Sequence, residues 1–326
     1  MSTKISQFSH PSLYYYPNDK DIINKKFNNY TLNIDNLWLV KPPRSGGGKG
    51  ISILDSLTNI TNKDFLITKY ITNIDLINNK KYDLRVYALV TGLKPLRIYF
   101  YNEGLIRIAS KNFSLNYDSI QNKYVHLTNT DINLKSKDFI LANSTQNSKA
   151  NTWNFYMYEK HLKQLNIDFE NIKYKIKDII IKSMISLYQN LTSELYQNRL
   201  NDINFYDLLG YDILLTKDYE PFLLEINSGP SIISNNALDK PIKTNLLVDT
   251  LNIVGISPYS KVNLPKQFQT STITIEQNIN NALCELTRPR GDFELIFPLK
   301  NNINSYKRFF RNINNKENIL FWNRIK

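Results

Sequence analysis

Two acids and an amide interrupt apolar runs toward the C-terminal third of the chain. Asp212 lies in Tyr-Asp-Ile-Leu-Leu, and Glu225 and Asn227 lie in Leu-Leu-Glu-Ile-Asn-Ser. A polar turn between these runs predicts a hairpin of strands 211–216 and 221–227. Because side chains alternate along a strand, Glu225 and Asn227 share a face that Asp212 can reach. Three oxygen side chains suit Mg²⁺, and ordinary salt-bridged or edge carboxylates are the alternative.

Two arginines and a further acid interrupt another apolar stretch. Asp83 and Arg85 alternate with apolar residues in Tyr-Asp-Leu-Arg-Val-Tyr, and Arg107 stands between two isoleucines. Polar turns at 91–95 and 102–104 predict a three-stranded meander. Guanidinium groups bind carboxylate or phosphoryl oxygens in a bidentate manner, so this sheet is a candidate site for either group. A structural Asp–Arg pair is the alternative.

A glycine-rich loop near the N-terminus carries positive charge. The stretch 37–54 reads as a strand, three consecutive glycines and a second strand, with Lys41, Arg44 and Lys49 around the loop. Glycines let backbone N–H groups approach an anion closely, which predicts a hairpin folded over phosphates. The Walker A spacing is absent. A mobile glycine turn with solvated lysines is the alternative, and Lys69 in the next apolar strand also requires an anionic partner.

The composition excludes some classes of protein but does not identify one. The chain has 326 residues, one cysteine, three histidines and a formal net charge of +12. No apolar run reaches the roughly 18 residues of a membrane span, and the N-terminus lacks a signal-peptide core, which predicts a cytoplasmic protein. The positive charge indicates an acidic partner or a codon bias toward Asn, Ile and Lys, but no nucleic-acid motif accompanies it.

The remaining stretches supply the expected scaffold. Apolar residues at three- and four-residue steps over 172–195 predict a long amphipathic helix, and a shorter helix is expected over 241–254. The polar stretch 130–150 is expected to be a loop. Nine Lys and Arg against three acids over 288–326 indicate a basic end, where Lys307, Arg308 and Arg311 beside Phe309 and Phe310 form either a basic aromatic patch or a solvated helix face.

Several of these motifs occur together in one order. This combination resembles the tubulin tyrosine ligase-like family, over about residues 37 to 300. The resemblance implies an α+β protein with the ATP-grasp fold, in which the nucleotide binds between two lobes. It implies an enzyme that uses ATP and Mg²⁺ to join a free amino acid to a carboxylate of an acidic protein tail, usually that of tubulin, through an acyl phosphate. The motifs are the Lys-Pro strand with its glycine loop, Tyr82–Tyr87, Pro95–Tyr99, His126–Asn129, Leu209–Leu215 and Leu224–Ser231.

The resemblance also implies roles for individual residues. The expected nucleotide contacts are Lys41, Gly48, Lys49, Gly50, Lys69, Tyr70, Ile71 and Asn129. The expected substrate contacts are Lys81, Asp83, Arg85 and Arg107. The expected metal ligands are Asp212, Glu225 and Asn227, and the expected catalytic residues are Arg85, Arg107 and Glu225.

The sequence leaves the domain boundaries and the exact activity as expectations with alternatives. We expect an approach segment at 1–36, the catalytic domain at 37–300 and a basic tail at 301–326, without most of the usual N-terminal lobe. Gly47 stands where the family often has an arginine. Glutamate is the favoured amino acid, with tyrosine or glycine as alternatives. An inactive, nucleotide-gated microtubule-binding protein is the alternative of another class, and no membrane or specific nucleic acid is expected as a partner.

Overall fold

The structure is a computed structural model that describes most of the chain. Arg44, Arg311 and nearly all of the expected approach segment 1–36 lie outside the described residues. Among the helices of the described residues, none is long and apolar enough to cross a membrane. The described residues are 12–14, 37–42, 47–54, 65–142, 147–197, 205–234, 236–255, 274–310 and 316–325.

The chain forms two compact units, and each draws on several stretches of sequence. Unit 1 comprises Met1–Arg85, Leu105–Lys175 and Asp212–Glu225. Unit 2 comprises Val86–Gly104, Ile176–Tyr211 and Ile226–Lys326.

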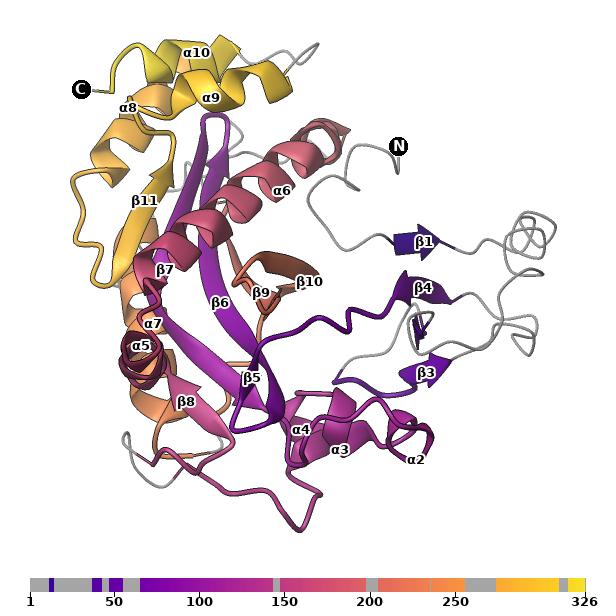
Figure 1. The fold of residues 1–326 in the computed structure, drawn as a ribbon. Helices are drawn as coiled ribbons and strands as arrows, with labels where there is room; N and C mark the ends of the chain where they lie inside the picture. Colours follow the sequence, from indigo (N-terminus) through magenta and orange to yellow (C-terminus); the bar gives the residue numbers. More distant parts are fainter. Residues whose placement is uncertain are drawn as a thin grey trace, which may run out of the picture. The chain divides into compact units, whose positions relative to one another are not determined.

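A small antiparallel sheet in unit 1 contains the two strands that flank the glycine loop (Figure 1). Val40 pairs with Ser52 across them, so the predicted hairpin is confirmed. Leu37, Ile53, Tyr70 and others form a buried cluster. The strand order is β1-β4-β2-β3, with β1 at Ser12–Tyr14, β2 at Trp38–Lys41, β3 at Ser52–Leu54 and β4 at Leu66–Lys69.

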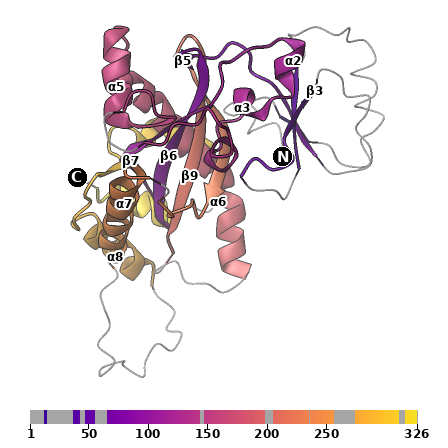
Figure 2. The same ribbon diagram turned by 90° about the horizontal axis from the view of Figure 1, so that it is seen from below.

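The larger sheet has seven strands, and β9 lies beside β6 in it (Figures 1 and 2). Its order is β10-β9-β6-β7-β11, with β5 paired to β6 and β8 paired to β7. The predicted acidic hairpin is confirmed as β9 and β10, and β9 begins earlier than expected. The bounds are β5 Leu76–Ile77, β6 Lys80–Leu93, β7 Leu96–Ile108, β8 Thr152–Asn154, β9 Asp207–Leu215, β10 Pro221–Ser228 and β11 Phe293–Phe297.

The predicted three-stranded meander is wrong, because β6 and β7 are two long strands. The expected turn at 102–104 lies inside β7. Tyr101 pairs with β11, whereas Leu105 pairs with β8, so these residues mark a change of partner along one strand edge. The Asn102 N–H donates to the Asp292 carbonyl at 3.0 Å, which keeps the strand extended. Polar residues here therefore signal a junction of the sheet and not a reversal of the chain.

The two predicted helices are confirmed as α6 and α7. Along α6, Ile172, Ile176 and Ile180 are buried, as the helical spacing requires. The expected loop 130–150 is wrong at its start, where helix α4 forms and Asn133 is buried. The helices are α2 Tyr117–Ile120, α3 Lys123–His126, α4 Thr130–Asn133, α5 Phe155–Gln164, α6 Phe169–Gln197, α7 Asp239–Val254, α8 Ile275–Glu285, α9 Ile303–Lys307, the 3₁₀ helix η5 Arg308–Phe310 and α10 Lys316–Trp322.

The residues after 300 contribute aromatic rings to the core of unit 2. Phe310 stacks on Phe297 at a ring-centroid distance of 6.0 Å and contacts Trp322 edge-on at 5.5 Å. Phe321 is fully buried as well. The predicted basic aromatic patch is therefore wrong for Phe310, because its ring is packed inside and is not available to a partner.

Candidate functional site

A network of charged side chains in unit 1 joins three strands. The Arg107 guanidinium on β7 donates to both oxygens of Asp83 on β6, at 2.7 and 2.5 Å. The same arginine lies 2.7 Å from Asp212 Oδ2 on β9. Arg85 on β6 donates to both oxygens of Asp212, at 2.5 and 3.1 Å. Two arginines and two acids predicted from separate motifs therefore form one cluster.

Asp212 and Arg107, the two groups at the centre of the network, favour their charged forms. Burial alone disfavours the charged form of Asp212, but Arg107 and Arg85 outweigh burial and hold the pKa of this carboxyl well below its usual range. Burial likewise opposes the charge on Arg107, yet Asp212 and Asp83 raise its pKa well above the ordinary value. Within the described ranges, Nη1 of Arg85 and of Arg107 has no hydrogen-bond partner, so each guanidinium retains a donor for a ligand oxygen.

Glu225 and Lys41 lie in the electrostatic field of this network. A side-chain hydrogen bond with Glu225 contributes to the lowered pKa of Asp212. Burial lowers the pKa of Lys41 at the end of β2, and the charges of Glu225 and Asp212 oppose that effect. The structure therefore brings a lysine from the glycine-loop hairpin near both acids of the β9–β10 hairpin.

The acids fit a hard divalent cation. Asp212 and Glu225 are adjacent carboxyl groups joined by a hydrogen bond, and a divalent cation bound between them would replace the proton that this hydrogen bond requires. Asn227 is two residues beyond Glu225, on the same face of β10, and its Nδ2 donates to the Gly210 carbonyl at 3.3 Å. The described part of the chain contains no group of three His, Cys, Asp or Glu side chains that could hold a metal. Oxygens from water or a phosphate would have to complete the coordination, as is usual for Mg²⁺.

Lys81 lies at one end of a directed hydrogen-bond chain. Its Nζ donates to the Tyr70 hydroxyl at 3.1 Å, and that hydroxyl lies 2.9 Å from His126 Nδ1. His126 Nε2 lies 3.0 Å from the Ser119 carbonyl, so Nε2 carries the proton and Nδ1 accepts from Tyr70. Burial, with Lys81 nearby, lowers the pKa of His126 to about 4, which keeps the imidazole neutral.

The charge of Lys81 is itself easily lost. Burial lowers its pKa to about 8; Asp83 raises the value and Lys41 lowers it further. Lys81 is thus still mainly protonated at neutral pH and lies between a carboxylate of the network and the lysine of β2. Such a cation is suited to neutralise charge that develops on a substrate.

The glycine loop packs on the turn that carries Asn129. Gly48 has φ +74°, and a side chain there would place its Cβ 2.7 Å from Asn129 Oδ1 and 2.7 Å from Ile132 Cδ1. Gly50 has φ +73° and approaches Pro42 equally closely. Only glycine meets both requirements at these positions. The predicted nucleotide contacts Gly48, Gly50 and Asn129 are therefore near neighbours.

The other predicted nucleotide contacts lie on or next to the small sheet. The Lys69 Nζ lies 5.2 Å from the ring centroid of Trp38, a cation–π distance. The Tyr70 N–H already donates to the Leu37 carbonyl at 2.9 Å. Ile71 follows it, half-buried, and Lys49 is exposed in the loop. The Tyr70 side chain thus belongs mainly to the buried hydrogen-bond chain that links His126 to Lys81.

Three residues that support the site were not assigned a role from the sequence. The Thr128 hydroxyl donates to Asp83 Oδ2 at 2.6 Å, which adds a third donor to that carboxylate. His126 orients Tyr70, as described above. Asn133 Oδ1 accepts from the Ser110 N–H and hydroxyl at 2.8 and 2.6 Å. Thr128 and His126 lie in the run His126–Asn129, so the sequence motif could have pointed to them. Asn133 lies in a stretch that looks like a polar loop, and nothing in the sequence marks it.

Buried charges, a glycine-rich hairpin and paired carboxyl groups define a site suited to nucleotide phosphates and a carboxylate substrate. A model of the tubulin-tyrosine ligase family matches residues 2–264. The chain therefore belongs to this family, and its mixed fold with antiparallel sheets agrees with the expected α+β ATP-grasp architecture. The match also covers most of the expected approach segment 1–36, so the boundaries at 36 and 300 stay predictions.

Curated relatives carry glutamylase names. The chain is 33% identical over 247 residues to the tubulin monoglutamylase TTLL4 of Mus musculus, which covers 75% of this chain and 20% of that protein. It is 36% identical over 219 residues to the tubulin polyglutamylase ttll-4 of Caenorhabditis elegans, covering 67% and 36%. It is 32% identical over 220 residues to the tubulin polyglutamylase TTLL5 of Homo sapiens, covering 67% and 17%. The chain thus spans between about a sixth and about a third of these relatives.

Proposed function

We propose that the chain is an ATP-dependent ligase that joins glutamate to a carboxylate of an acidic protein tail, with tubulin as the acceptor and the cytoplasm as the location. The observation that supports this most directly is the proximity of Lys41 to Asp212 and Glu225, beside the Arg85–Arg107 pair. The glutamylase names of the relatives favour glutamate and tubulin.

The proposed division of labour follows the position of each side chain. Lys41, Lys69 and the glycine loop would hold the nucleotide phosphates, and Asp212, Glu225 and Asn227 would hold Mg²⁺. When bound, MgATP supplies the phosphoryl group that activates the acceptor carboxylate. The neutral His126 and the Tyr70 hydroxyl orient the Lys81 ammonium beside Asp83.

The two arginines have the geometry of substrate clamps. Asp83 and Asp212 fix both guanidiniums through paired hydrogen bonds, so little reorientation is needed when a substrate oxygen arrives. Their remaining Nη1 donors would bind the substrate carboxylate and stabilise the negative charge that forms on its oxygens. Preorganised donors of this kind typically contribute about 10²–10³-fold in kcat.

One incorporation assay tests the function. The purified chain is incubated with MgATP, a tubulin-tail peptide and radiolabelled glutamate, with parallel reactions that contain tyrosine or glycine. We expect ATP-dependent incorporation of glutamate above that of the other two. Incorporation of tyrosine or glycine instead of glutamate would show that the proposed amino-acid donor is wrong. If no amino acid is incorporated but the chain sediments with microtubules in a nucleotide-dependent manner, the chain is a binding protein and not a ligase.

A further inference from the structure

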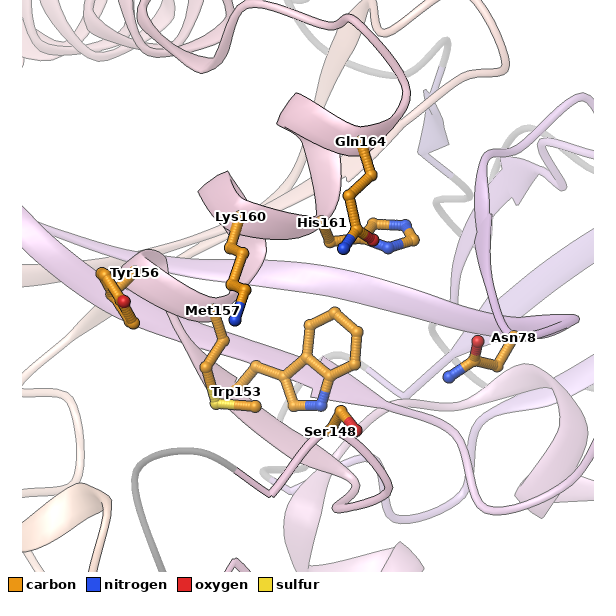
Figure 3. A pocket seen from close by; sticks show the side chains of 8 residues that line it. All are labelled: Asn78, Ser148, Trp153, Tyr156, Met157, Lys160, His161 and Gln164. Atoms are coloured by element: carbon orange, nitrogen blue, oxygen red, sulfur yellow. The ribbon is translucent and has the colours of Figure 1, made fainter.

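A pocket lies between β8 and α5 in unit 1, apart from the charged network. Its volume is about 440 Å³, and its lining includes Trp153, Met157, Lys160 and His161 (Figure 3). Trp153 and Met157 are buried and form an apolar floor, whereas Lys160 is exposed. The pocket thus combines an apolar base with the ammonium group of Lys160, a combination that suits an anion carried on a short apolar stem.

This pocket opens on the sheet face opposite Arg107. In the pairing of β7 with β8, Ile106 lies across from Trp153 and Arg107 lies across from Thr152. Residues directly opposite each other in an antiparallel pair share a face, and successive residues alternate. Trp153 therefore faces away from the side that carries the Arg107 guanidinium, so the pocket is not an extension of the charged network.

An unsatisfied donor lines the pocket. Trp153 is 4% exposed, and its indole N–H has no hydrogen-bond partner among the residues that the structure describes. Buried donors without a partner are uncommon, since each loses its bond to water without replacement. Figure 3 shows the nitrogen-bearing edge of the indole directed toward Ser148, an exposed residue in the turn before β8. This nitrogen is itself buried, so a ligand oxygen would reach its N–H only if the Ser148 side chain turned aside.

Two basic residues, Lys160 and His161, line the pocket together with Trp153. His161 contacts the Trp153 ring edge-on at a centroid distance of 5.6 Å. Within the described ranges, neither Lys160 nor His161 forms an ion pair, whereas Lys163 on the same helix pairs with Glu159 at 2.7 Å. The acid that His161 affects electrostatically is Asp75, and its carboxylate already accepts from Tyr82 at 2.6 Å.

We propose that the β8–α5 pocket binds a carboxylate, which accepts a hydrogen bond from the Trp153 indole and is attracted by the Lys160 ammonium. A carboxylate fits because it supplies the missing acceptor and the negative charge together, and its aliphatic stem lies against Met157. The source is either an acidic side chain of a polypeptide or a free acidic amino acid. This binding does not depend on ligation, so it stands or falls independently of the proposed activity.

Indole NMR signals provide a local readout of the pocket. The chain contains three tryptophans, Trp38, Trp153 and Trp322, so a ¹⁵N-labelled sample gives three indole N–H signals. Titration arms are a glutamate-rich peptide, the same peptide with glutamine in place of glutamate, and free glutamate, all without ATP. We expect the Trp153 signal to move downfield with at least one carboxylate arm and to stay in place with the glutamine peptide. The arm with the lower Kd identifies the source.

Matched variants separate the pocket from general effects. Trp153→Phe should weaken binding roughly tenfold, because a hydrogen bond to a charged group is lost while the ring stays. Trp322→Phe is its control, since that indole N–H is also buried and has no partner within the described part of the chain, but lies in unit 2. Lys160→Gln should weaken binding about two- to fivefold, and Lys163→Gln should not.

A variant on the opposite face completes the design. Arg85→Lys should leave the Trp153 shift intact, because Arg85 belongs to the charged network. The proposal is overturned if the Trp153 signal is unmoved by both carboxylate arms at millimolar concentration. It is equally overturned if the glutamine peptide moves that signal as far, or if Lys160→Gln and Trp153→Phe both bind as tightly as the original chain.

Discussion

The β6–β7 strand pair carries two buried arginine–carboxylate networks that differ in how many charges they hold. In unit 2, Glu285 alone accepts from Arg97, Thr91 and Tyr99. The remaining Arg97 donors reach the carbonyls of Pro95 and Thr91. The charges of Glu285 and Arg97 therefore balance each other, and neighbouring hydroxyl and carbonyl groups complete their hydrogen bonds.

The network in unit 1 holds more charges than its own pairing requires. Arg107 is shared between Asp83 and Asp212, and Glu225 lies beside Asp212. Burial lowers the pKa of Lys81, and the nearby charge of Lys41 lowers it further. Like charges held together cost stability, and a fold retains such groups where a ligand supplies the compensation. The comparison supports the proposal that the unit 2 network stabilises the fold whereas the unit 1 network serves chemistry.

Glu285→Ala should produce the largest loss of stability. It leaves Arg97 buried without its carboxylate, which typically costs about 3–5 kcal/mol in the free energy of unfolding. Urea unfolding measures this, and ligation per folded molecule should be retained. Glu276→Ala on the same helix is the control, because Glu276 forms an exposed pair with Arg324 and should change stability hardly at all. If Glu285→Ala were stable but inactive in ligation, the unit 2 network would serve activity and not stability, which is the opposite of our proposal.

Glu225→Gln should abolish ligation without unfolding the protein. It removes a carboxyl group beside Asp212 from an exposed position, so the folded state loses little, while kcat should fall by roughly 10²–10³-fold. Labelled-glutamate incorporation and thermal unfolding measure the two effects. Glu220→Gln is the matched control in the same hairpin, where Glu220 pairs with Lys175. Near-normal ligation by Glu225→Gln would remove Glu225 from the metal site.

The charge of Lys81 should appear in the pH dependence of stability. Its pKa is about 8 in the folded protein and 10.5 ordinarily, so the unfolded chain holds the proton more tightly in that range. Stability relative to Lys81→Met should therefore be flat below pH 8 and rise between pH 8 and 10.5, by at most about 3 kcal/mol. Chemical denaturation at several pH values measures the difference. A constant difference over pH 7–10.5 would contradict the burial of a charged Lys81.

Gly48→Ala should have a modest effect on stability and a specific effect on nucleotide binding. A positive φ costs a non-glycine residue about 1–2 kcal/mol, and the new Cβ would also displace the loop from Asn129. The KM for ATP should rise several-fold. Gly229→Ala is the control, because Gly229 has φ +64° but open space around its Cβ. Equal KM values in the two variants would show that the contact with Asn129 is unimportant.

Local patterns in the sequence predicted the elements that carry the site better than the connections between them. Alternation around Asp83, Arg85 and Glu225 correctly placed these residues on strands. The same reasoning misread Asn102–Gly104 as a turn, since the change of edge partner from β11 to β8 depends on residues far away in the sequence. Turn residues report local backbone preference, and tertiary pairing overrides that preference.

The grouping of charges was less predictable than their positions. Both Arg97 and Arg107 stand in apolar strands, and nothing in their immediate neighbours distinguishes an arginine that stabilises the fold from one that we propose acts in catalysis. The distinction lies in Glu285 and Asp212, which are more than a hundred residues away in the sequence. The sequence also concealed Asn133, because its buried bonds depend on how the chain folds back on Ser110. The family resemblance supplied the roles that local patterns left open.

The most direct test of the account is a paired Arg→Lys exchange on β7. Arg107→Lys and Arg97→Lys each keep the positive charge and remove the bidentate geometry. Ligation and unfolding free energy are measured for both variants. The account predicts that Arg107→Lys loses at least about 10²-fold in kcat and keeps most of its stability, whereas Arg97→Lys loses stability and keeps its ligation per folded molecule. Equal losses of ligation in the two variants would contradict it.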